Sequence, residues 1–284
     1  MTVHLVIQSP ALGADHVEQA AAMAQANGVQ RMSATAARLR AVNDDADTRQ
    51  ALRQWGEQEE VDIAFVPAGR ALADCKILAM DMDSTLINIE CIDELADLAG
   101  VKHRVSEITE AAMRGEIKDF SESLRRRVAL LTGASAEGLD TVYAQRLRLN
   151  PGAEELISTA QAAGIRVLLV SGGFTFFTSR LQARLKLDAA YANELEVIDG
   201  KYTGHVQGRI LDAQAKLDYL NAFAAEHGAS PEQIIAIGDG ANDLKMLGAA
   251  GYAVAYRAKP IVREQTPYAI NVCGLDAVLN WFEH

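Results

Sequence analysis

Three short apolar runs constrain the fold of this 284-residue chain more than any other feature. They cover residues 76–80, 165–170 and 233–237, and each is long enough for one buried strand. The segments around them have helical periodicity, with predicted helices near 152–163, 174–185, 212–227 and 242–249. Strands that alternate with helices are typical of a parallel sheet covered by helices. The sequence therefore predicts an α/β fold.

Two segments interrupt this alternation. Residues 90–148 have helical patterns throughout and are predicted to form an insertion between the first two strands. Asp199-Gly200 separates the runs 194–198 and 201–206, which is the two-residue turn pattern of a β-hairpin.

The first 70 residues have a different pattern. Strand-like segments at 2–8, 30–42 and 61–66 alternate with helix-like segments at 13–27 and 45–58, and the middle segment could supply two strands. The resulting βαββαβ order suits a small α+β unit of the ferredoxin-like kind. Pro67-Ala68-Gly69-Arg70 is a plausible linker, so we expect one domain at 1–70 and a second at 71–284.

Composition limits the partners of the chain. A formal net charge of −11 argues against an extended nucleic-acid surface, because the phosphates would be repelled. Cys75, Cys91 and Cys273 have no paired spacing, so neither a disulfide framework nor a zinc site is predicted, and reducing cytoplasm is the expected compartment. The sequence has no apolar stretch long enough to cross a bilayer, and we expect a soluble protein.

Polar residues follow all three predicted core strands. Asp81 and Asp83 follow the first, Ser171-Gly172-Gly173 the second, and Gly238-Asp239-Gly240 the third. The carboxyl ends of neighbouring parallel strands open into one crevice, so these residues are expected to meet. Taken alone, Ser-Gly-Gly and Gly-Asp-Gly are most often ordinary turns. Their occurrence after successive strands favours a shared site.

The residue types at this crevice indicate metal-assisted phosphoryl transfer. Asp81 could act as a nucleophile, with Asp83 beside it as an acid or base and a divalent cation between them. Asp239 offers a third hard oxygen ligand, and Ser171 and its glycines offer a hydroxyl and backbone N–H groups to an anion. Carboxylate and carbonyl ligands describe an octahedral magnesium site better than a zinc site.

Two cations lie on the apolar sides of their predicted helices. Lys216 falls in a stripe with Leu220 and Phe223, where it either reaches water past the apolar surface or neutralises an anion in the site. Arg127 falls among leucines and Val128, and could grip a carboxylate or form a structural ion pair within the insertion. Its neighbours Arg125 and Arg126 are interpreted as a solvated face.

Four of these motifs together resemble the haloacid dehalogenase superfamily of phosphatases. They are Asp81-Met82-Asp83-Ser84-Thr85, Ser171-Gly172-Gly173, Lys216 and Gly238-Asp239-Gly240-Ala241-Asn242-Asp243. Further stretches resemble the phosphoserine phosphatase family in particular, and the resemblance spans about 75–275. These stretches are Glu90 to Leu95, Ala112 to Gly115, Phe120 with Arg125 to Leu130, and Ser171 to Phe177. The preceding residues are similar in outline to an ACT-like domain.

This resemblance implies a Rossmann-like core with a helical cap insertion, and a role for each matching residue. Asp81 would become phosphorylated, and Asp83 would serve as acid and then base. Magnesium would be held by Asp81, the Asp83 carbonyl and Asp239, with Asp243 supporting the metal shell or the lysine. The substrate-binding residues would be Ser171, Gly172, Lys216 and Asn242 at the phosphate, Glu90 at the ammonium, Arg127 at the carboxylate, and Met113 and Phe120 lining the cap.

The expected activity is hydrolysis of O-phospho-L-serine to serine and phosphate, as the last step of serine biosynthesis. Transfer of the phosphoryl group to another alcohol instead of water shares the same chemistry up to the intermediate, and the sequence leaves it open. A third hypothesis treats residues 1–70 as an amino-acid-sensing or dimerising module. A homodimer is compatible with the sequence, and no nucleic-acid or membrane partner is expected.

Overall fold

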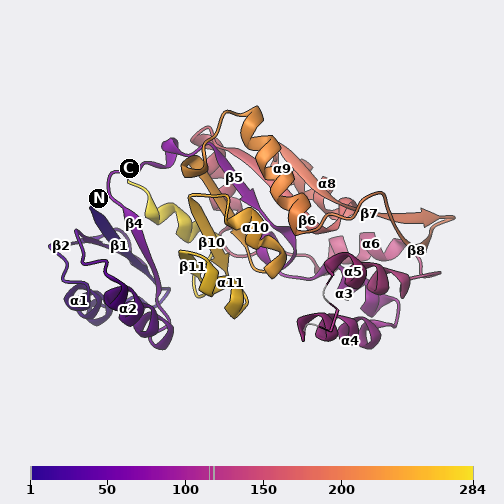
Figure 1. Ribbon diagram of the computed structural model, residues 1–284, viewed down its shortest axis with the longest axis horizontal. Helices are drawn as coiled ribbons and strands as arrows, with labels where there is room; N and C mark the ends of the chain where they lie inside the picture. Colours follow the sequence, from indigo (N-terminus) through magenta and orange to yellow (C-terminus); the bar gives the residue numbers. More distant parts are fainter. Residues whose placement is uncertain (1, 115, 118, 284) are drawn as a thin grey trace.

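The computed structural model describes residues 2–114, 116–117 and 119–283. Within these residues the strands form two sheets, one of four strands and one of seven. In Figure 1 the small sheet and its helices lie at one end, the large sheet at the centre, and a group of helices at the other end. The predicted α/β core and the preceding α+β unit are both confirmed.

The N-terminal unit has the predicted βαββαβ order. Its elements are β1 (Val3–Gln8), α1 (Ala14–Met23), β2 (Gly28–Arg31), β3 (Ala36–Arg40), α2 (Ala46–Gln58) and β4 (Asp62–Pro67). The strands pair antiparallel in the order β2-β3-β1-β4, so β1 is enclosed between β3 and β4. Helix α2 begins where the Asp45 carboxylate accepts the Thr48 N–H at 2.7 Å. Leu52 and Trp55 of this helix pack against the sheet in one buried cluster.

The central sheet contains the three predicted core strands as neighbours. Its strands are β5 (Ile77–Met80), β6 (Arg166–Phe174), β7 (Ala189–Ile198), β8 (Lys201–Gln207), β9 (Ile234–Gly238), β10 (Tyr252–Tyr256) and β11 (Tyr268–Ile270). Their order is β11-β10-β9-β5-β6-β7-β8, and all neighbours are parallel except β7 and β8. Strand β5 lies between β9 and β6. The ends of these three strands, which are followed by the polar residues of the predicted site, are therefore neighbours. The sequence did not predict β10 and β11, which are short and depend on pairing within the sheet.

Helices cover both faces of this sheet. They are α7 (Ala153–Ala162), α8 (Thr175–Leu185), α9 (Ala213–Glu226), α10 (Leu244–Leu247) and α11 (Pro260–Gln265), with a short turn η5 (Ala241–Asp243) before α10. The predicted helices at 152–163, 174–185 and 212–227 are confirmed. The last one, predicted at 242–249, is shorter and begins with the η5 turn.

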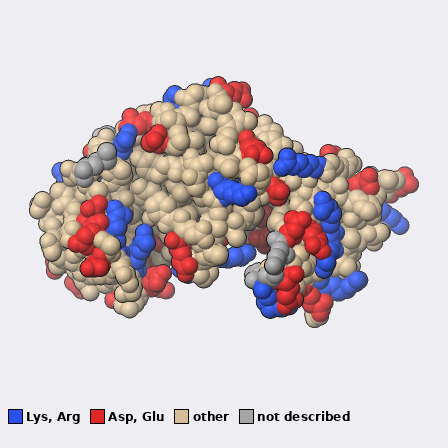
Figure 2. Space-filling model, viewed as in Figure 1, with Lys and Arg blue, Asp and Glu red and all other residues tan. Residues whose placement is uncertain are grey.

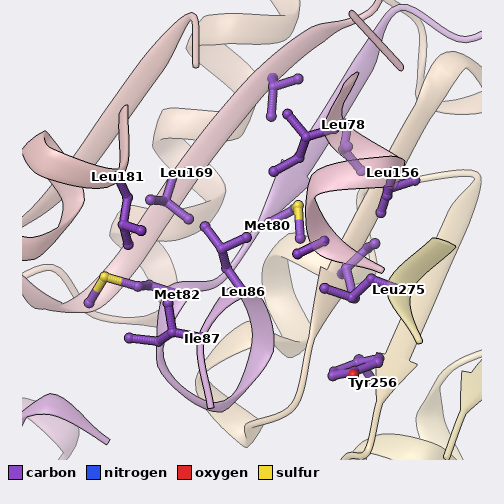
Figure 3. Packing of buried hydrophobic residues seen from close by; sticks show 14 of the residues in the cluster. Leu78, Met80, Met82, Leu86, Ile87, Leu156, Leu169, Leu181, Tyr256 and Leu275 are labelled. Carbon is purple, nitrogen blue, oxygen red and sulfur yellow. The ribbon is translucent and has the colours of Figure 1, made fainter. Parts of the chain in front are cut away.

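Alternation along β5 divides the core into two clusters. Leu78 and Met80 point to one face, and Ile77 and Ala79 to the other, as successive strand residues must. Figure 3 shows the first cluster, where Leu78 and Met80 lie with Leu169 of β6, Leu156 of α7 and Leu181 of α8. The second cluster packs against Leu220 and Phe223 of α9, the helix that carries Lys216. A strand buried on both faces explains why 76–80 is an unbroken apolar run.

The insertion between β5 and β6 is helical, as predicted. It contains α3 (Cys91–Leu98), α4 (Lys102–Met113), α5 (Phe120–Ala129), α6 (Glu137–Thr141) and η3 (Val142–Arg146). The predicted hairpin is also present, because β7 and β8 pair across Asp199-Gly200. Both turn residues have positive φ, 50° and 72°, the conformation that two-residue hairpin turns require. Strand β8 contacts α5, so the hairpin supports the insertion, called the cap below.

Two buried charges join the N-terminal unit to the core. The Asp62 carboxylate, 3% exposed, accepts N–H groups of Asn271, Val272 and Cys273. Arg38, 5% exposed, donates from its guanidinium to the carbonyls of Asn280 and Phe282 near η6 (Leu275–Trp281). Each charged group therefore has hydrogen-bond partners across the contact between the units. The domain boundary near residue 70 stays a prediction.

The surface carries charges of both signs. Figure 2 shows acidic and basic side chains interspersed on one face, with a notch between the central part and the helical end. Among the residues that the structure describes, no helix combines the length and the apolar content needed to cross a membrane. The three cysteines are free thiols, two of them buried.

Candidate active site

The ends of β5, β6 and β9 bring most of the predicted residues together. Asp81 follows β5 directly, and Asp239 follows β9. Carboxylate oxygens of Asp81, Asp239 and Asp243 lie within 4.8 Å of one another. Lys216 reaches this cluster from α9, with Nζ 2.7 Å from Asp81 and 2.6 Å from Asp243. Residues separated by more than 150 positions in the sequence thus form one polar cluster.

A strained turn fixes the carboxylate of Asp81. Its backbone N–H donates to Ile237 of β9, and its Oδ1 accepts the Met82 N–H at 2.7 Å. The following turn η2 (Met82–Leu86) contains Ser84 at a φ of 57°, a conformation that non-glycine residues rarely adopt. Asn150 stabilises the turn, since its Nδ2 donates to the carbonyls of Thr85 and Ile87. Asp81 is therefore held in one orientation by the surrounding backbone.

Lys216 is completely buried, so the alternative in which it reaches water is wrong. Burial alone would lower the pKa of this ammonium. The carboxylates of Asp243 and Asp81 outweigh that effect and raise the pKa above its ordinary value. Lys216 therefore remains charged, and it places a fixed positive charge beside Asp81.

Asp243 supports both Lys216 and the loop that carries Asp239. Its Oδ1 accepts from Lys216, while its Oδ2 accepts the backbone N–H groups of Asp239 and Gly240. A β-carbon at Gly238 would lie 2.5 Å from Cγ of Asp243, so only glycine permits this approach. With both oxygens engaged, Asp243 fits a positioning role better than a direct ligand role.

The carboxyl groups of Asp81 and Asp239 concentrate negative charge at the end of β5 and β9. Asp239 Oδ1 accepts the Thr85 hydroxyl at 3.0 Å, and within the described residues its Oδ2 and the Oδ2 of Asp81 have no hydrogen-bond partner. Burial, followed by the charges of Asp243 and Glu90, raises the pKa of Asp239 to about 7. Burial and Asp243 also raise the pKa of Asp81, while Lys216 opposes them. A divalent cation would relieve this crowding of negative charge, and hard carboxylate oxygens suit it.

Asp83 is held beside the Ser171-Gly172-Gly173 segment. A β-carbon at Gly173 would lie 2.8 Å from Oδ2 of Asp83. Burial and then the nearby Glu90 raise the pKa of Asp83 to about 8, although contacts with Cys91 oppose them. Its Oδ1 is buried and has no partner among the described residues. A raised pKa favours the protonated form of this carboxyl group, which can act as a general acid.

The Ser171-Gly172-Gly173 segment is a bulge within β6 and not a loop after it. Val170 pairs with Tyr191 of β7, whereas Phe174 pairs with Asn193, so the intervening residues are displaced from the ladder. The hydroxyl of Ser171, fully buried, accepts the Gly173 N–H at 2.8 Å. The sequence placed the end of the strand at residue 170, because glycines usually interrupt a strand.

Phe120 of the cap contacts this bulge. A β-carbon at Gly172 would lie 2.8 Å from Cζ of Phe120, so the contact requires a residue without a side chain. Phe120 is the first residue of α5, which starts where Asp119 accepts the Ser121 N–H. The first turn of α5 is therefore directed at the core side of the site.

The other end of the site has charges of both signs. Glu90 precedes α3 and accepts the Ser84 hydroxyl at 2.7 Å. Burial lowers the pKa of Arg127, while the charges of Glu90, Asp93 and Asp83 oppose that effect. Within the described residues none of them comes within ion-pair distance, and Arg127 bonds only weakly to the Ser123 carbonyl, at 3.4 Å. Arg127 thus forms no structural ion pair with a described residue, whereas exposed Arg126 pairs with Glu122.

Two further predicted residues are Met113 and Asn242. The side chain of Met113 lies outside the described residues. Asn242 is half-buried, and its carboxamide packs over Gly240. The sequence reasoning did not single out Thr85, Asn150 or Asn193, although Thr85 belongs to the Asp81 motif. Only hydrogen-bond partners distant in the sequence reveal these three.

Comparison with known proteins identifies the family of this chain. The model of the haloacid dehalogenase-like hydrolase family matches residues 78–248, and a domain of unknown function, DUF4072, matches residues 5–52. The phosphoserine phosphatase of Polaromonas sp. is 57% identical over 212 residues, which are 73% of this chain and 90% of that protein. The chain belongs to the phosphoserine phosphatase family of haloacid dehalogenase-like hydrolases. Members of this family are phosphomonoesterases, consistent with the buried carboxylates and lysine.

Solved structures resemble both parts of this phosphoserine phosphatase family member. A haloacid dehalogenase family hydrolase from Salmonella enterica serovar Typhi covers 100% of this chain and 99% of its own, with 32% identity and a TM-score of 0.88. Two phosphoserine phosphatase structures are described as a phospho-aspartyl intermediate analogue and a substrate-bound complex. Each has 40% identity and a TM-score of 0.69, and covers 74% of this chain and 99% of its own.

Proposed function

We propose that this chain hydrolyses O-phospho-L-serine to L-serine and phosphate, with Mg²⁺, as the closing step of serine biosynthesis. The observation that carries the proposal is the buried cluster in which Lys216 bridges Asp81 and Asp243 while Asp239 lies within reach. A carboxylate held beside a fixed cation, with oxygens left over for a metal, is suited to attack a phosphoryl group.

Asp81 is the proposed nucleophile. Its free oxygen forms a bond to phosphorus, the bond from phosphorus to the serine oxygen breaks, and Asp83 gives its proton to that oxygen. Water then attacks the phosphorylated Asp81, Asp83 takes a proton from it, and phosphate leaves. The raised pKa of Asp83 favours the acid role in the first half. The family member described as a phospho-aspartyl intermediate analogue supports this route.

The donors in the cluster fit a magnesium ion. Asp239 would hold it through its free oxygen, together with the Asp81 carboxylate and the Asp83 carbonyl, as carboxylate and carbonyl oxygens suit a hard cation. When bound, such an ion polarises the phosphoryl oxygens and neutralises developing charge. Ser171, Gly172, Lys216 and Asn242 would surround the phosphate itself.

Recognition of the amino-acid part is assigned to the cap. Among the described residues Arg127 forms no ion pair and bonds only weakly to the Ser123 carbonyl, so its guanidinium is available to the substrate carboxylate. Glu90 is exposed and would receive the ammonium, with Phe120 and Met113 lining the pocket. These two charged residues match the two charges that distinguish phosphoserine from a simple alkyl phosphate.

The experiment that tests this function is a phosphate-release assay over a panel of phosphomonoesters with Mg²⁺ present. Phosphoserine should give the highest kcat/KM of the panel. A higher value for a sugar phosphate or nucleotide would contradict the assignment. Comparing the products with and without an added acceptor alcohol separates hydrolysis from phosphotransfer, since only the transferase makes a new phosphate ester.

The N-terminal unit and the cellular setting are further proposals. A serine-sensing role for residues 1–70 predicts that serine changes the activity of the full chain but not of a chain that begins near Ala71. Three free thiols support a reducing compartment such as the cytoplasm.

The edge strand β2, with Val29 exposed, is a surface through which two copies of the chain could pair as a homodimer. Light scattering would measure the molar mass in solution and so distinguish a monomer from a dimer.

A further inference from the structure

Asn193 lies opposite the bulge that carries Ser171, Gly172 and Gly173. It pairs with Phe174 in the β6–β7 ladder, immediately after the residues displaced by the bulge. Its side chain is 2% exposed, although a carboxamide is costly to bury unless its donors and acceptors find partners. Its burial therefore requires hydrogen-bond partners at both ends of the carboxamide.

Both ends of the carboxamide bond to backbone groups from different parts of the chain. Nδ2 donates to the Gly172 carbonyl at 2.8 Å, and Oδ1 accepts the Leu211 N–H at 2.7 Å. The partners fix the orientation of the amide, because only an amino group can face a carbonyl and only an oxygen can face an N–H. No other side chain at this position offers both groups at this length.

The first bond fixes the peptide between Gly172 and Gly173. A glycine pair has unusual conformational freedom, so this peptide would otherwise be free to rotate. With its carbonyl bound to Asn193, its N–H is directed at the Ser171 hydroxyl, the bond observed at 2.8 Å. Asn193 thus fixes the orientation of the segment proposed to bind phosphate.

The second bond fixes the entry to α9. Leu211 precedes Asp212, whose carboxylate accepts the Ala215 N–H and starts the helix. Lys216 lies in the first turns of that helix, with Nζ 2.7 Å from Asp81. One buried side chain therefore connects the Ser171 segment to the element that supplies the active-site lysine.

We propose that Asn193 is a positioning residue that sets the Ser171-Gly172-Gly173 segment against Lys216, so that both contact the same phosphoryl group. This inference rests on the proposed phosphatase function. Misplacement of a binding group by about 1 Å can cost about 100-fold in rate, and the predicted defect lies at the phosphate, which all substrates share. Loss of Asn193 should then affect every phosphomonoester alike.

The test compares Asn193→Ala and Asn193→Asp with a matched control, Gln161→Ala. Gln161 is also a carboxamide that donates to two backbone carbonyls, those of Leu185 and Lys186, but at the far ends of α7 and α8. Asn193→Asp keeps the acceptor for Leu211 and replaces the donor to Gly172 by an oxygen. For each variant we would measure kcat/KM on phosphoserine and 4-nitrophenyl phosphate, the inhibition constant of inorganic phosphate, and the melting temperature.

We expect both Asn193 variants to lose about 10- to 100-fold in kcat/KM on both substrates and to bind inorganic phosphate more weakly. Gln161→Ala should lower the melting temperature while keeping kcat/KM within about twofold of the original chain. If Asn193→Ala does not fold, Asn193→Asp decides the matter by the same criteria. Activity within twofold of the original chain, or a loss confined to phosphoserine, would overturn the inference. Failure of the unaltered chain to release phosphate from any ester would instead overturn the proposed function.

Discussion

Lys216 Nζ lies 2.7 Å from Oδ1 of Asp81, and both side chains are almost entirely buried. The same oxygen accepts the Met82 N–H, so the remaining oxygen of Asp81 is the one left for chemistry. A nucleophile whose two oxygens have different environments is oriented before substrate binds. This reduces the rearrangement that the reaction would otherwise require.

Replacing Asp81 by Asn should abolish turnover without unfolding the chain. The substitution keeps the shape of the side chain but removes the nucleophilic oxygen, so kcat should fall by at least about 1,000-fold. Phosphate release measures the activity, and circular dichroism during heating measures the fold. Residual turnover above about 1% in a well-folded Asp81→Asn sample would refute the nucleophile assignment.

Replacing Lys216 by Met should cost both stability and activity. The change leaves the buried carboxylates of Asp81 and Asp243 without their cation, which typically destabilises by about 3 kcal/mol or more. Denaturant unfolding would measure the free energy of unfolding. Lys245→Met is a suitable control, because Lys245 is an exposed lysine that bonds to Gln214. Equal stability of the two variants would show that the buried cluster does not need the lysine charge.

Arg127→Ala should reduce kcat/KM far more for phosphoserine than for an aryl phosphate. Only phosphoserine has a carboxylate to lose, and a charge-assisted bidentate contact is worth about tenfold or more. Arg126→Ala is the matched control, because Arg126 is its exposed neighbour and pairs with Glu122. Parallel losses on both substrates would assign Arg127 a structural role.

Removal of divalent cations should silence the enzyme. Without a cation the carboxylates of Asp81 and Asp239 repel each other and the phosphoryl charge is not neutralised. Dialysis against a chelator followed by Mg²⁺ should restore phosphate release, whereas Ca²⁺ should restore it poorly because its coordination is looser. Full activity in the chelator would contradict the metal assignment.

Asp62→Ala should weaken the contact between the N-terminal unit and the core. The backbone N–H groups of Asn271, Val272 and Cys273 would lose their acceptor, at a cost of about 2–3 kcal/mol in the free energy of unfolding. Asp44→Ala, at an exposed position, should have little effect by the same measurement. A chain that begins at Ala71 should have a lower melting temperature, because it lacks the Asp62 carboxylate as well. The effect of serine on activity should therefore be compared between samples of both chains that are shown to be folded. An unchanged melting temperature for Asp62→Ala would mean that solvent replaces the lost carboxylate.

Much of the fold and the main site residues could be predicted because they leave local patterns. The run 76–80 and the Asp81 motif are contiguous, and the helical periodicity of α9 and α5 placed Lys216 and Arg127 on apolar faces. The strands β10 and β11 were not predicted, since β11 has only three residues and the pairing that places both strands in the sheet is not visible in the local sequence.

The sequence by itself determined which chemical groups follow which strands, because strand ends and glycine turns are encoded locally. Only the tertiary structure decided which oxygen of Asp81 stays free, that Asp243 holds Lys216 and the Asp239 loop together, and that Asn193 joins Gly172 to Leu211. Several of these relationships depend on bonds between residues far apart in the sequence, such as the 18 positions between Asn193 and Leu211, and their geometry is set when the sheet assembles. The spacing of residues along the chain does not determine this geometry.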